Sequence, residues 1–386
     1  MKPVRLLKIM RISIITPARR GTRHGNRITA ERWARILRLL GHRVRVGTEY
    51  SDRSADLLVA LHARKSHKSV ARFRREHPDR PIFVVLTGTD VYQDLGRSAM
   101  ARRSLQLADR LIALQPLAAR QVPAHLRDKV RVIYQSYDAR RGRNPSRNRQ
   151  GPLHQPRDCQ GAGLPSRDRG HDRNQNRARQ KAAPSLRPLS TPLRPQLATK
   201  PPSLRPHTFD ICVVGHLRAV KDPFRTALAA RLLHPESRIR VPHFGAAMSQ
   251  AMKQRARREE KVNPRYRWFG DRPHGEVLKR LARSQLLVIS SRLEGGANVL
   301  SEAIALGVPV LATRIPGTVG ILGTKYPGYF EPGDTRMLGE LMSRAETRPS
   351  FLEKLRTACR KVVMLVEPEN EHRAWRELLS ESWTGA

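Results

Sequence analysis

The chain has 386 residues, and its 74 Lys and Arg outweigh 33 Asp and Glu to give a formal net charge of +41. No stretch approaches the roughly 18 to 20 consecutive apolar residues that a membrane span needs, and the first residues lack the apolar core of a signal peptide. We therefore expect a cytoplasmic protein of about two to three domains. The three cysteines, Cys159, Cys212 and Cys359, form no close pair and indicate neither a disulfide framework nor a zinc knuckle.

Short apolar runs alternate with amphipathic stretches in the first part of the chain. The runs that we predict to be strands are Arg11 to Pro17, Arg43 to Val46, Asp56 to Leu61, Pro81 to Leu86, Arg110 to Leu114 and Val130 to Tyr134. The stretch from Asn26 to Leu40 has the period of an amphipathic helix, and Gly41 follows as its end. Such alternation is typical of a parallel sheet covered on both faces. Residues 10–137 are predicted to form a Rossmann-like, doubly wound α/β domain, and Met10 is as suitable a start as Met1.

Residues 138–207 differ in composition from both flanks. They hold 16 Lys or Arg, 4 Asp, no Glu and 11 of the 28 prolines, and they contain no Val, Ile, Phe, Tyr, Trp or Met. Such a tract cannot bury enough apolar surface to offset the roughly 1 to 2 kcal/mol that ordering each residue's backbone costs. We predict a disordered Arg/Pro-rich linker, with a frame error in the gene as an alternative. An RNA-binding arm is less favoured, because the tract has no aromatic side chains to stack on bases.

The same alternation resumes after residue 207. The predicted strands are Phe209 to Val214, Arg238 to Val241, Tyr266 to Phe269, Gln285 to Ser290 and Pro309 to Ala312, with helices near 223–233, 248–260, 274–283, 298–306, 335–346, 350–365 and 369–381. Residues 208–366 are predicted to form a second Rossmann-like domain. Residues 367–386 are predicted to form a C-terminal helix that packs back on the first domain. Ligands of two such domains bind in a central crevice, at the carboxyl ends of the strands.

The most informative motif is SSRLEGGANVLSEA, from Ser290 to Ala303. Glu294 stands at the end of a predicted strand, and Glu302 lies eight residues later in the following helix. Backbone amides at 296–299, exposed by the glycines and by the helix start, make a cradle for an anion. A carboxylate in the next turn can accept hydrogen bonds from the hydroxyls of a ribose.

A second motif, GHLRAVKDP, follows the first strand of this half. Asp222 and Pro223 are predicted at the N-cap and first turn of the next helix. Arg218 and Lys221 then lie on a strand-to-helix loop, where two cations can neutralise a departing diphosphate.

On these motifs, the second half resembles the nucleotide-binding domain of retaining GT-B glycosyltransferases of family 4. The resemblance implies that Glu302 binds the ribose and that Lys221 binds the diphosphate. Glu294 would face the donor sugar, a UDP-sugar. The implied donor site consists of Gly215, His216, Arg218, Lys221, Glu294, Gly295, Gly296, Ala297, Asn298, Val299 and Glu302, of which Glu294, Arg218 and Lys221 take part in catalysis. The chain departs from the family pattern at His216, where the family has arginine.

Finer features are similar to the selenosugar synthases of selenoneine biosynthesis. They include TPARRGTRHGNRITA, VALHARKS, LTGTD, VIYQS and RIPGTVGILG. This resemblance implies transfer of a sugar from UDP-N-acetylglucosamine to selenophosphate, with formation of a carbon–selenium bond. The loop after the first strand carries cations and glycines suited to an anionic acceptor. The implied acceptor residues are Arg20, Gly21, Gly25, Asn26, His62, Thr87, Gly88, Thr89 and Asp90, and Arg19, Arg23 and Arg27 lie in the same loop.

No metal-ligand motif is evident in the patterned regions, so we expect an enzyme without a metal or other cofactor. An anionic selenium nucleophile needs no strong general base. The alternatives are a family 4 transferase that acts on a lipid, glycan or protein, a sugar-nucleotide epimerase of similar fold, and a basic RNA-binding protein on the same fold. We expect no specific nucleic-acid partner; the oligomeric state and the stereochemical outcome are left open.

Overall fold

The structure is a computed structural model that describes residues 9–22, 24–139 and 208–381. These residues belong to one compact unit of the chain. The predicted linker at 138–207 lies almost entirely outside the described residues, as do Arg23 and Cys159.

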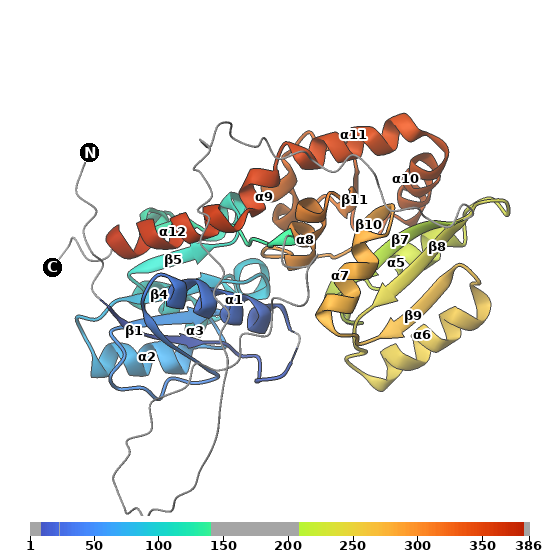
Figure 1. Cartoon of the computed structure of the whole chain (residues 1–386). Coiled ribbons are helices and arrows are strands. Elements are labelled where there is room, and N and C mark those ends of the chain that lie inside the picture. The colour runs from blue at the N-terminus through green and yellow to red at the C-terminus, as the bar shows by residue number, and fades with distance from the viewer. Residues whose placement is uncertain (1–8, 23, 140–207, 382–386) are drawn as a thin grey trace, which may run out of the picture. The chain divides into compact units, whose positions relative to one another are not determined.

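The first half of the chain forms a sheet of six parallel strands in the order β2-β1-β3-β4-β5-β6. The strands are β1 (Arg11–Ile15), β2 (Arg43–Gly47), β3 (Leu57–Leu61), β4 (Ile82–Leu86), β5 (Arg110–Ala113) and β6 (Val130–Val132). The helices are α1 (Gly25–Leu39), α2 (His67–Glu76) and α3 (Ala99–Leu107), with short turns η1 (Asp90–Asp94), η2 (Pro116–Gln121) and η3 (Ala124–Lys129). Every predicted strand of this half is present (Figure 1).

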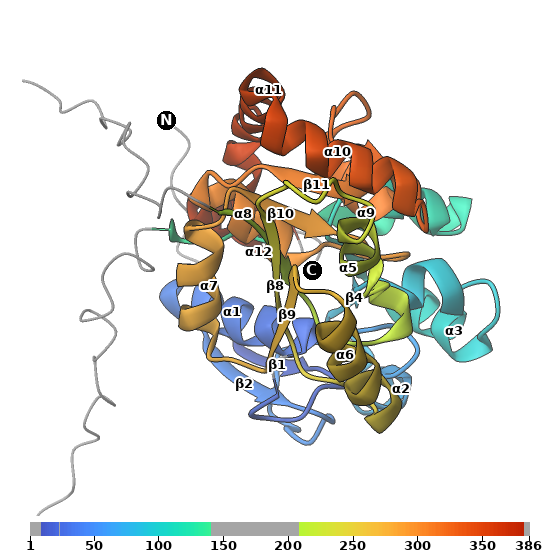
Figure 2. The same ribbon diagram turned by 90° about the vertical axis from the view of Figure 1, so that its right-hand side faces the viewer.

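The second half forms another six-stranded parallel sheet, in the order β12-β11-β10-β7-β8-β9. Its strands are β7 (Phe209–Val214), β8 (Ile239–Phe244), β9 (Tyr266–Gly270), β10 (Leu286–Ile289), β11 (Val310–Thr313) and β12 (Tyr329–Phe330). Its helices are α5 (Arg225–Ala230), α6 (Gln250–Val262), α7 (His274–Ala282), α8 (Asn298–Leu306), α9 (Pro316–Leu322), α10 (Thr335–Thr347) and α11 (Pro349–Arg360), with turns η5 (Ala219–Lys221) and η6 (Val363–Val366). Figure 2 shows α10 and α11 beside β11. The predicted α/β architecture of two doubly wound sheets is confirmed.

The apolar residues explain why helices cover both faces of the first sheet. In β3 and β4 all side chains are buried, whereas a sheet with one solvated face would alternate. One face packs on α2 and α3 around Phe73 and Leu105. The other face packs on α1, around Trp33 and Leu37. A strand buried on both sides needs a continuous apolar sequence, which is the pattern read from the chain.

The last helix, α12 (Pro368–Glu381), belongs to the core of the first half. Its Trp375 packs edge to face on Trp33 of α1, with ring centroids 5.0 Å apart. Figure 1 shows α12 beside β5. The Glu371 carboxylate is 1% exposed and accepts hydrogen bonds from Trp33 Nε1 at 2.6 Å and from Ser136 N at 3.1 Å. Arg32 supplies the compensating positive charge at 3.2 Å.

The topology places four loops at the two switch points. In the first sheet β2 and β3 lie on opposite sides of β1, so the loops after β1 and β3 diverge there. In the second sheet β8 and β10 lie on opposite sides of β7, so the loops after β7 and β10 diverge likewise. In doubly wound sheets, ligands bind at the carboxyl ends of the strands at such points.

Several details differ from the sequence-based expectations. The helix predicted over 223–233 spans only Arg225–Ala230, and the helix predicted over 350–365 ends at Arg360 and continues as the separate turn η6. The elements α9 and β12 were not predicted, because α9 carries two glycines and β12 has only 2 residues. Neither has a periodic pattern long enough to recognise.

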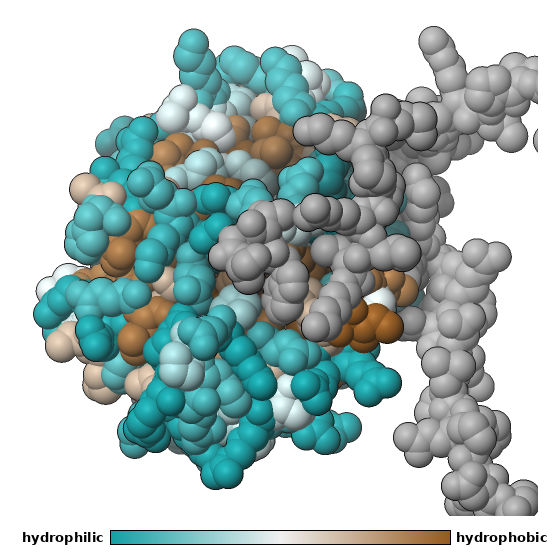
Figure 3. Space-filling model, turned by 90° about the vertical axis from the view of Figure 1, so that its left-hand side faces the viewer, coloured by the Kyte–Doolittle hydropathy of each residue, from teal (hydrophilic) through white to brown (hydrophobic). Residues whose placement is uncertain are grey.

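The face of the molecule drawn in Figure 3 is largely hydrophilic, with hydrophobic side chains in small separate groups. This agrees with a chain in which 28% of residues are charged. Among the helices that the structure describes, none has the length and apolarity required to cross a membrane.

Replacing Glu371 by alanine should destabilise the fold. The substitution leaves the Arg32 guanidinium and Trp33 N–H without their carboxylate, and breaking a buried ion pair costs about 3 to 5 kcal/mol. Urea unfolding of the full chain, followed by circular dichroism, measures the loss. Glu377→Ala, an exposed position on the same helix, should change the free energy of unfolding by less than about 0.5 kcal/mol. Equal effects of the two substitutions would contradict the anchoring role of Glu371.

Candidate active site

The loops that carry the two donor motifs meet at the switch point of the second sheet. Ser290, after β10, donates a hydrogen bond from Oγ to the backbone oxygen of Asp222 at 2.9 Å. The backbone N–H of Arg292 donates to the oxygen of Val220 at 2.9 Å. The loop after β7 and the loop after β10 are therefore fixed to each other.

Lys221 and Glu294, one from each of these loops, form an ion pair. The Lys221 ammonium contacts Glu294 Oε1, and the Ser291 hydroxyl donates to the same oxygen at 2.6 Å. The side chains of Lys221 and Glu294 are 23% and 10% exposed. The cation predicted for the diphosphate and the carboxylate predicted for the sugar thus lie within reach of one ligand.

Asp222 does not occupy the predicted helix N-cap. It ends the η5 turn in the left-handed conformation, with φ 43° and ψ 55°, and α5 begins at Arg225. The following Pro223 disfavours helical backbone at position 222, which explains the break. The Asp222 carboxylate instead binds the guanidinium of Arg225 at 3.0 Å and that of Arg292 at 3.5 Å. It holds the loop after β7 to the loop after β10.

Gly215 belongs to a tightly packed crossing of backbones. A Cβ on Gly245 would lie 2.1 Å from the Gly215 oxygen, and Gly245 has φ +148°. The same oxygen accepts a hydrogen bond from Nε2 of buried His243 at 3.1 Å, and Nδ1 of that ring accepts from the Tyr266 hydroxyl at 3.0 Å. Burial lowers the pKa of His243 to about 4, so the ring is neutral at pH 7.

His216, which departs from the family pattern, contacts the first half of the chain. Its Nδ1 accepts a hydrogen bond from the backbone N–H of Ala246 at 3.0 Å. Its ring meets that of His24 edge to face, with centroids 5.4 Å apart. Burial, and then the charges of Arg218 and Lys65, lower the pKa of His24. Sequence reasoning missed His24, because a lone histidine in a basic loop carries no motif. Arg218 itself is exposed at the start of η5.

The glycines after Glu294 allow a close approach between the two halves. A Cβ on Gly295 would lie 2.4 Å from the backbone C and O of Thr87, and one on Gly88, which has φ +136°, would lie 2.9 Å from Gly295 N. A Cβ on Gly296 would lie 2.7 Å from Cβ of Leu114. These glycines therefore have a packing role besides any exposure of their amides.

The start of α8 is held by a contact from α1. The N–H groups of Leu300 and Ser301 bond to the oxygen of Ala297, which precedes the helix. The N–H groups of Asn298 and Val299 lie in the first turn, where an α-helix offers no intrahelical partner. Arg32 Nη1 donates to Asn298 Oδ1 at 2.8 Å.

Glu302 lies one turn further along α8. Its carboxylate is 9% exposed and meets Nε2 of His274, which is 47% exposed at the start of α7, at 2.8 Å. Burial, and then the charges of Glu302 and Asp138, raise the pKa of Tyr137. His274 and Tyr137 were also missed by sequence reasoning, because neither lies in a motif.

The predicted acceptor residues at the end of β4 form one hydrogen-bonded turn around Asp90. This fully buried carboxylate accepts from the N–H groups of Thr87, Gly88 and Ala63 at 2.9, 2.8 and 3.0 Å. Asn26 Nδ2 donates to Thr87 Oγ1 at 3.4 Å, which joins the loop after β1 to this turn. The buried Asp90 carboxylate therefore fixes the backbone conformation of this turn.

His62, after β3, lies next to the same turn. It is a non-glycine residue with φ 76°, and its Nε2 is 3.1 Å from Thr89 Oγ1. Burial is the main cause that lowers the pKa of His62. A strained, buried histidine beside Thr89 is well placed to fix the turn's geometry.

The described residues of the loop after β1 include exposed cations and a glycine. Arg19, Arg20 and Gly21 are exposed, and Gly21 adopts φ +82°. Arg27 is buried and pairs with Glu31 at 2.6 Å, so it does not add to the exposed charge of the loop. Gly25 approaches the second half, since a Cβ there would lie 3.7 Å from Asn298 Nδ2.

Within the described residues, no group of three or more His, Cys, Asp or Glu is arranged to hold a metal ion. Of the cysteines that the structure describes, Cys212 and Cys359 are free and buried. Burial raises the pKa of the Cys212 thiol to about 12.

Residues 199–362 match the family model described as "Glycosyl transferases group 1". The match covers most of the second half of the chain. No match among curated proteins reaches significance. The predicted glycosyltransferase is thus confirmed at the level of this domain and of the fold.

Solved structures of glycosyltransferases share the fold over most of the chain. HepE from Anabaena in complex with UDP superposes with a TM-score of 0.66 at 14% identity, over 97% of this chain and 100% of that one. Sucrose-phosphate synthase from Thermosynechococcus elongatus gives 0.67 at 14% identity, over 98% and 100%. A UDP-forming α,α-trehalose-phosphate synthase from Burkholderia vietnamiensis gives 0.57 at 11% identity, over 85% and 74%. The fold is therefore GT-B, as the sequence predicts.

Gly295→Ala should push the two halves apart at Thr87. Overpacking of this kind costs about 1 to 3 kcal/mol, measured as a lower midpoint in urea unfolding. Gly275→Ala is the matched control, because a Cβ at Gly275 meets nothing within 4 Å. An unchanged midpoint for Gly295→Ala would contradict the close approach.

His243 should make the fold sensitive to acid. Its pKa in the folded state is depressed to about 4, below the ordinary value of 6.5, so its contribution to stability is complete above pH 6.5 and is lost as pH falls toward 4. The loss from this group is about 3 kcal/mol over that window. His243→Gln, which does not titrate, should show a flatter dependence of unfolding free energy between pH 6.5 and 4. A slope equal to that of the wild type would exclude His243 as the source.

Proposed function

We propose that the chain transfers a sugar from a UDP-sugar, and that the loops after β7 and β10 bind the donor. The observation that carries this proposal is the Lys221–Glu294 ion pair at the switch point of the second sheet, beside the first turn of α8. A bound diphosphate competes with Glu294 for the Lys221 ammonium. It also takes hydrogen bonds from the first-turn N–H groups of α8 and from exposed Arg218.

The nucleoside is held further along α8. Glu302 accepts hydrogen bonds from the two ribose hydroxyls, and His274 at 2.8 Å orients its carboxylate. When the diphosphate binds the Lys221 ammonium in place of Glu294, the Glu294 carboxylate is free to accept a hydrogen bond from a sugar hydroxyl. Both carboxylates thus act on neutral hydroxyl groups, while the cations act on the phosphates.

We propose selenophosphate as the acceptor and UDP-N-acetylglucosamine as the donor. Support comes from the exposed Arg19 and Arg20 on the loop after β1, and from the turn around Asp90 that touches Gly295. In the reaction, a selenium lone pair attacks the anomeric carbon and forms a carbon–selenium bond. The bond from that carbon to the diphosphate oxygen breaks, and its electron pair leaves with UDP.

The direct test incubates the purified full chain with UDP-N-acetylglucosamine and selenophosphate, and identifies products by mass. We expect UDP and a selenium-linked sugar in equal amounts. UDP release with a different acceptor, a lipid or a glycan, and none with selenophosphate would replace the acceptor and keep the donor assignment. UDP formation independent of any acceptor would exclude transfer.

Glu302→Ala should weaken UDP binding by about tenfold or more, because two hydrogen bonds to a charged group are lost. Isothermal titration with UDP measures the change in Kd. Glu276→Ala, which removes an exposed carboxylate on the neighbouring α7, should leave Kd unchanged. UDP binding of wild-type strength in Glu302→Ala would contradict the ribose assignment.

A further inference from the structure

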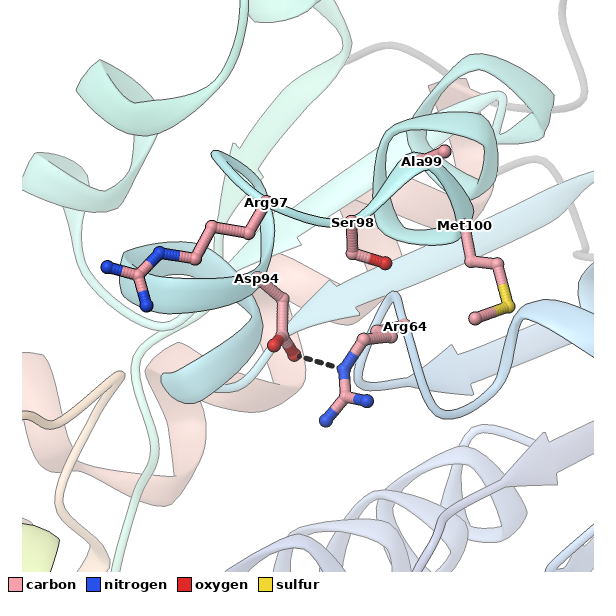
Figure 4. Close-up of a pocket in the computed structure, with 6 residues that line it drawn as sticks. All are labelled: Arg64, Asp94, Arg97, Ser98, Ala99 and Met100. Carbon is pink, nitrogen blue, oxygen red and sulfur yellow. Dashed lines mark ion pairs between the residues drawn. The ribbon is translucent and has the colours of Figure 1, made fainter.

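Arginine side chains of the first half occur near the candidate active site in two places that differ in geometry. A cavity of about 430 Å³, after β3 and β4, is lined by Arg64, Asp94, Arg97, Ser98, Ala99 and Met100. Figure 4 shows Arg64 and Arg97 extending in different directions on either side of Asp94, so the two guanidinium groups do not converge on one point. Arg32 of α1, in contrast, directs its three side-chain nitrogens to three different partners.

The Arg32 guanidinium joins three segments of the chain. Its Nε donates to the Glu371 carboxylate of α12 at 3.2 Å, and its Nη1 donates to Asn298 Oδ1 at the start of α8 at 2.8 Å. Its Nη2 lies 3.3 Å from the side-chain amide of Gln135, which follows β6. The Arg32 side chain is only 12% exposed. Its position is therefore fixed by protein groups on all three nitrogens.

The Gln135 amide bridges Arg32 and the backbone of Gly296. Gln135 is buried, and the two polar atoms of its amide lie 3.3 Å from Arg32 Nη2 and 2.8 Å from the Gly296 oxygen. The amide oxygen faces Arg32 and the amide nitrogen faces Gly296, because the reverse orientation would bring two donors together at one end and two acceptors at the other. Gln135 thus accepts from Arg32 and donates to the Gly296 carbonyl.

The bond from Gln135 fixes the direction of the next backbone N–H. The peptide unit between Gly296 and Ala297 is planar and trans, so the Ala297 N–H points away from Gln135, opposite to the Gly296 oxygen.

The Asn298 side chain is turned toward the first half. Its Oδ1 accepts from Arg32, and its Nδ2 is the atom that a Cβ on Gly25 would approach to 3.7 Å. The backbone N–H of Asn298 lies in the first turn of α8, where a helix offers no intrahelical partner. In the donor cradle, the backbone N–H of Asn298 is therefore the group left for a ligand, while its side chain serves as an anchor.

We propose that Arg32 and Gln135 are positioning residues for the donor diphosphate. They hold residues 296–298 so that the backbone N–H groups of Ala297 and Asn298 face the phosphates. This inference rests on the proposed function and adds residues of the first half that act through the backbone of the second. Amides that are oriented before binding need not be reordered when the phosphates arrive, so loss of this support weakens diphosphate binding. Binding of the nucleoside, which Glu302 holds further along α8, does not depend on it.

The test compares UDP with uridine, because uridine keeps the ribose hydroxyls and lacks the phosphates. Both are titrated calorimetrically against the full chain at one salt concentration. Gln135→Met keeps the approximate size of the side chain, removes its donor and adds no charge. It should raise Kd for UDP about tenfold and leave Kd for uridine unchanged. Arg32→Lys keeps the charge opposite Glu371, but one ammonium does not reproduce the planar donors, so it should have the same effect.

Trp375→Phe is the matched control for a loss of stability alone. Trp375 is fully buried in the core of the first half, where it packs on Trp33. The substitution should lower the midpoint of urea unfolding and leave Kd for both ligands unchanged. Wild-type Kd for UDP in Gln135→Met, or equal losses for UDP and uridine in that variant, would overturn the positioning role. A loss in Trp375→Phe equal to that in Gln135→Met would overturn it too.

Failure of the proposed function gives a different result. A wild-type chain that binds neither UDP nor uridine would overturn the donor assignment, and the positioning role with it. Binding of UDP that depends on Glu302, but is unchanged in Gln135→Met and Arg32→Lys, would keep the donor assignment and overturn the positioning role alone.

Discussion

The contact between the backbones of Gly88 and Gly295 is the constraint on which the candidate site depends. A Cβ on either residue would lie within 2.9 Å of the other segment, so only glycine permits this approach. It joins the acceptor turn after β4 to the loop after β10, in the second half. That loop carries Glu294, which pairs with Lys221, and it leads into α8. The contact between the two glycines therefore sets the position of these groups relative to the first half.

Arg32 extends the same coupling through polar groups. Its guanidinium pairs with buried Glu371 of α12 and also donates to Asn298 at the start of α8. One side chain of the first half therefore bonds to the last helix of the chain and to the helix that is proposed to hold the donor. Charged groups with such buried partners are expensive to disturb, which ties the stability of the fold to the geometry of the site.

Strong local patterns made the fold predictable and identified part of the candidate site. Strands β3, β4 and β10 coincide with continuous apolar runs, and the Lys221 and Glu294 motifs stand directly after β7 and β10. Contacts between distant segments left no local signal. The meeting of His24 with His216, the bond from His274 to Glu302 and the cavity at Arg97 each depend on how separate loops pack. The N-cap prediction for Asp222 is wrong because it rested on the preference of aspartate for N-caps. The following proline disfavours helical backbone at residue 222, and Asp222 adopts the left-handed conformation instead.

The hydrogen bond from Tyr137 N to the oxygen of Val366 marks where the chain crosses twice between its halves. One crossing follows residue 137, and the other enters α12. Because α12 inserts Trp375 into the core around Trp33, the end of the chain completes the core of the first half. A chain cut between residues 140 and 207 would therefore yield two fragments that remain associated, with the second supplying part of the first one's core.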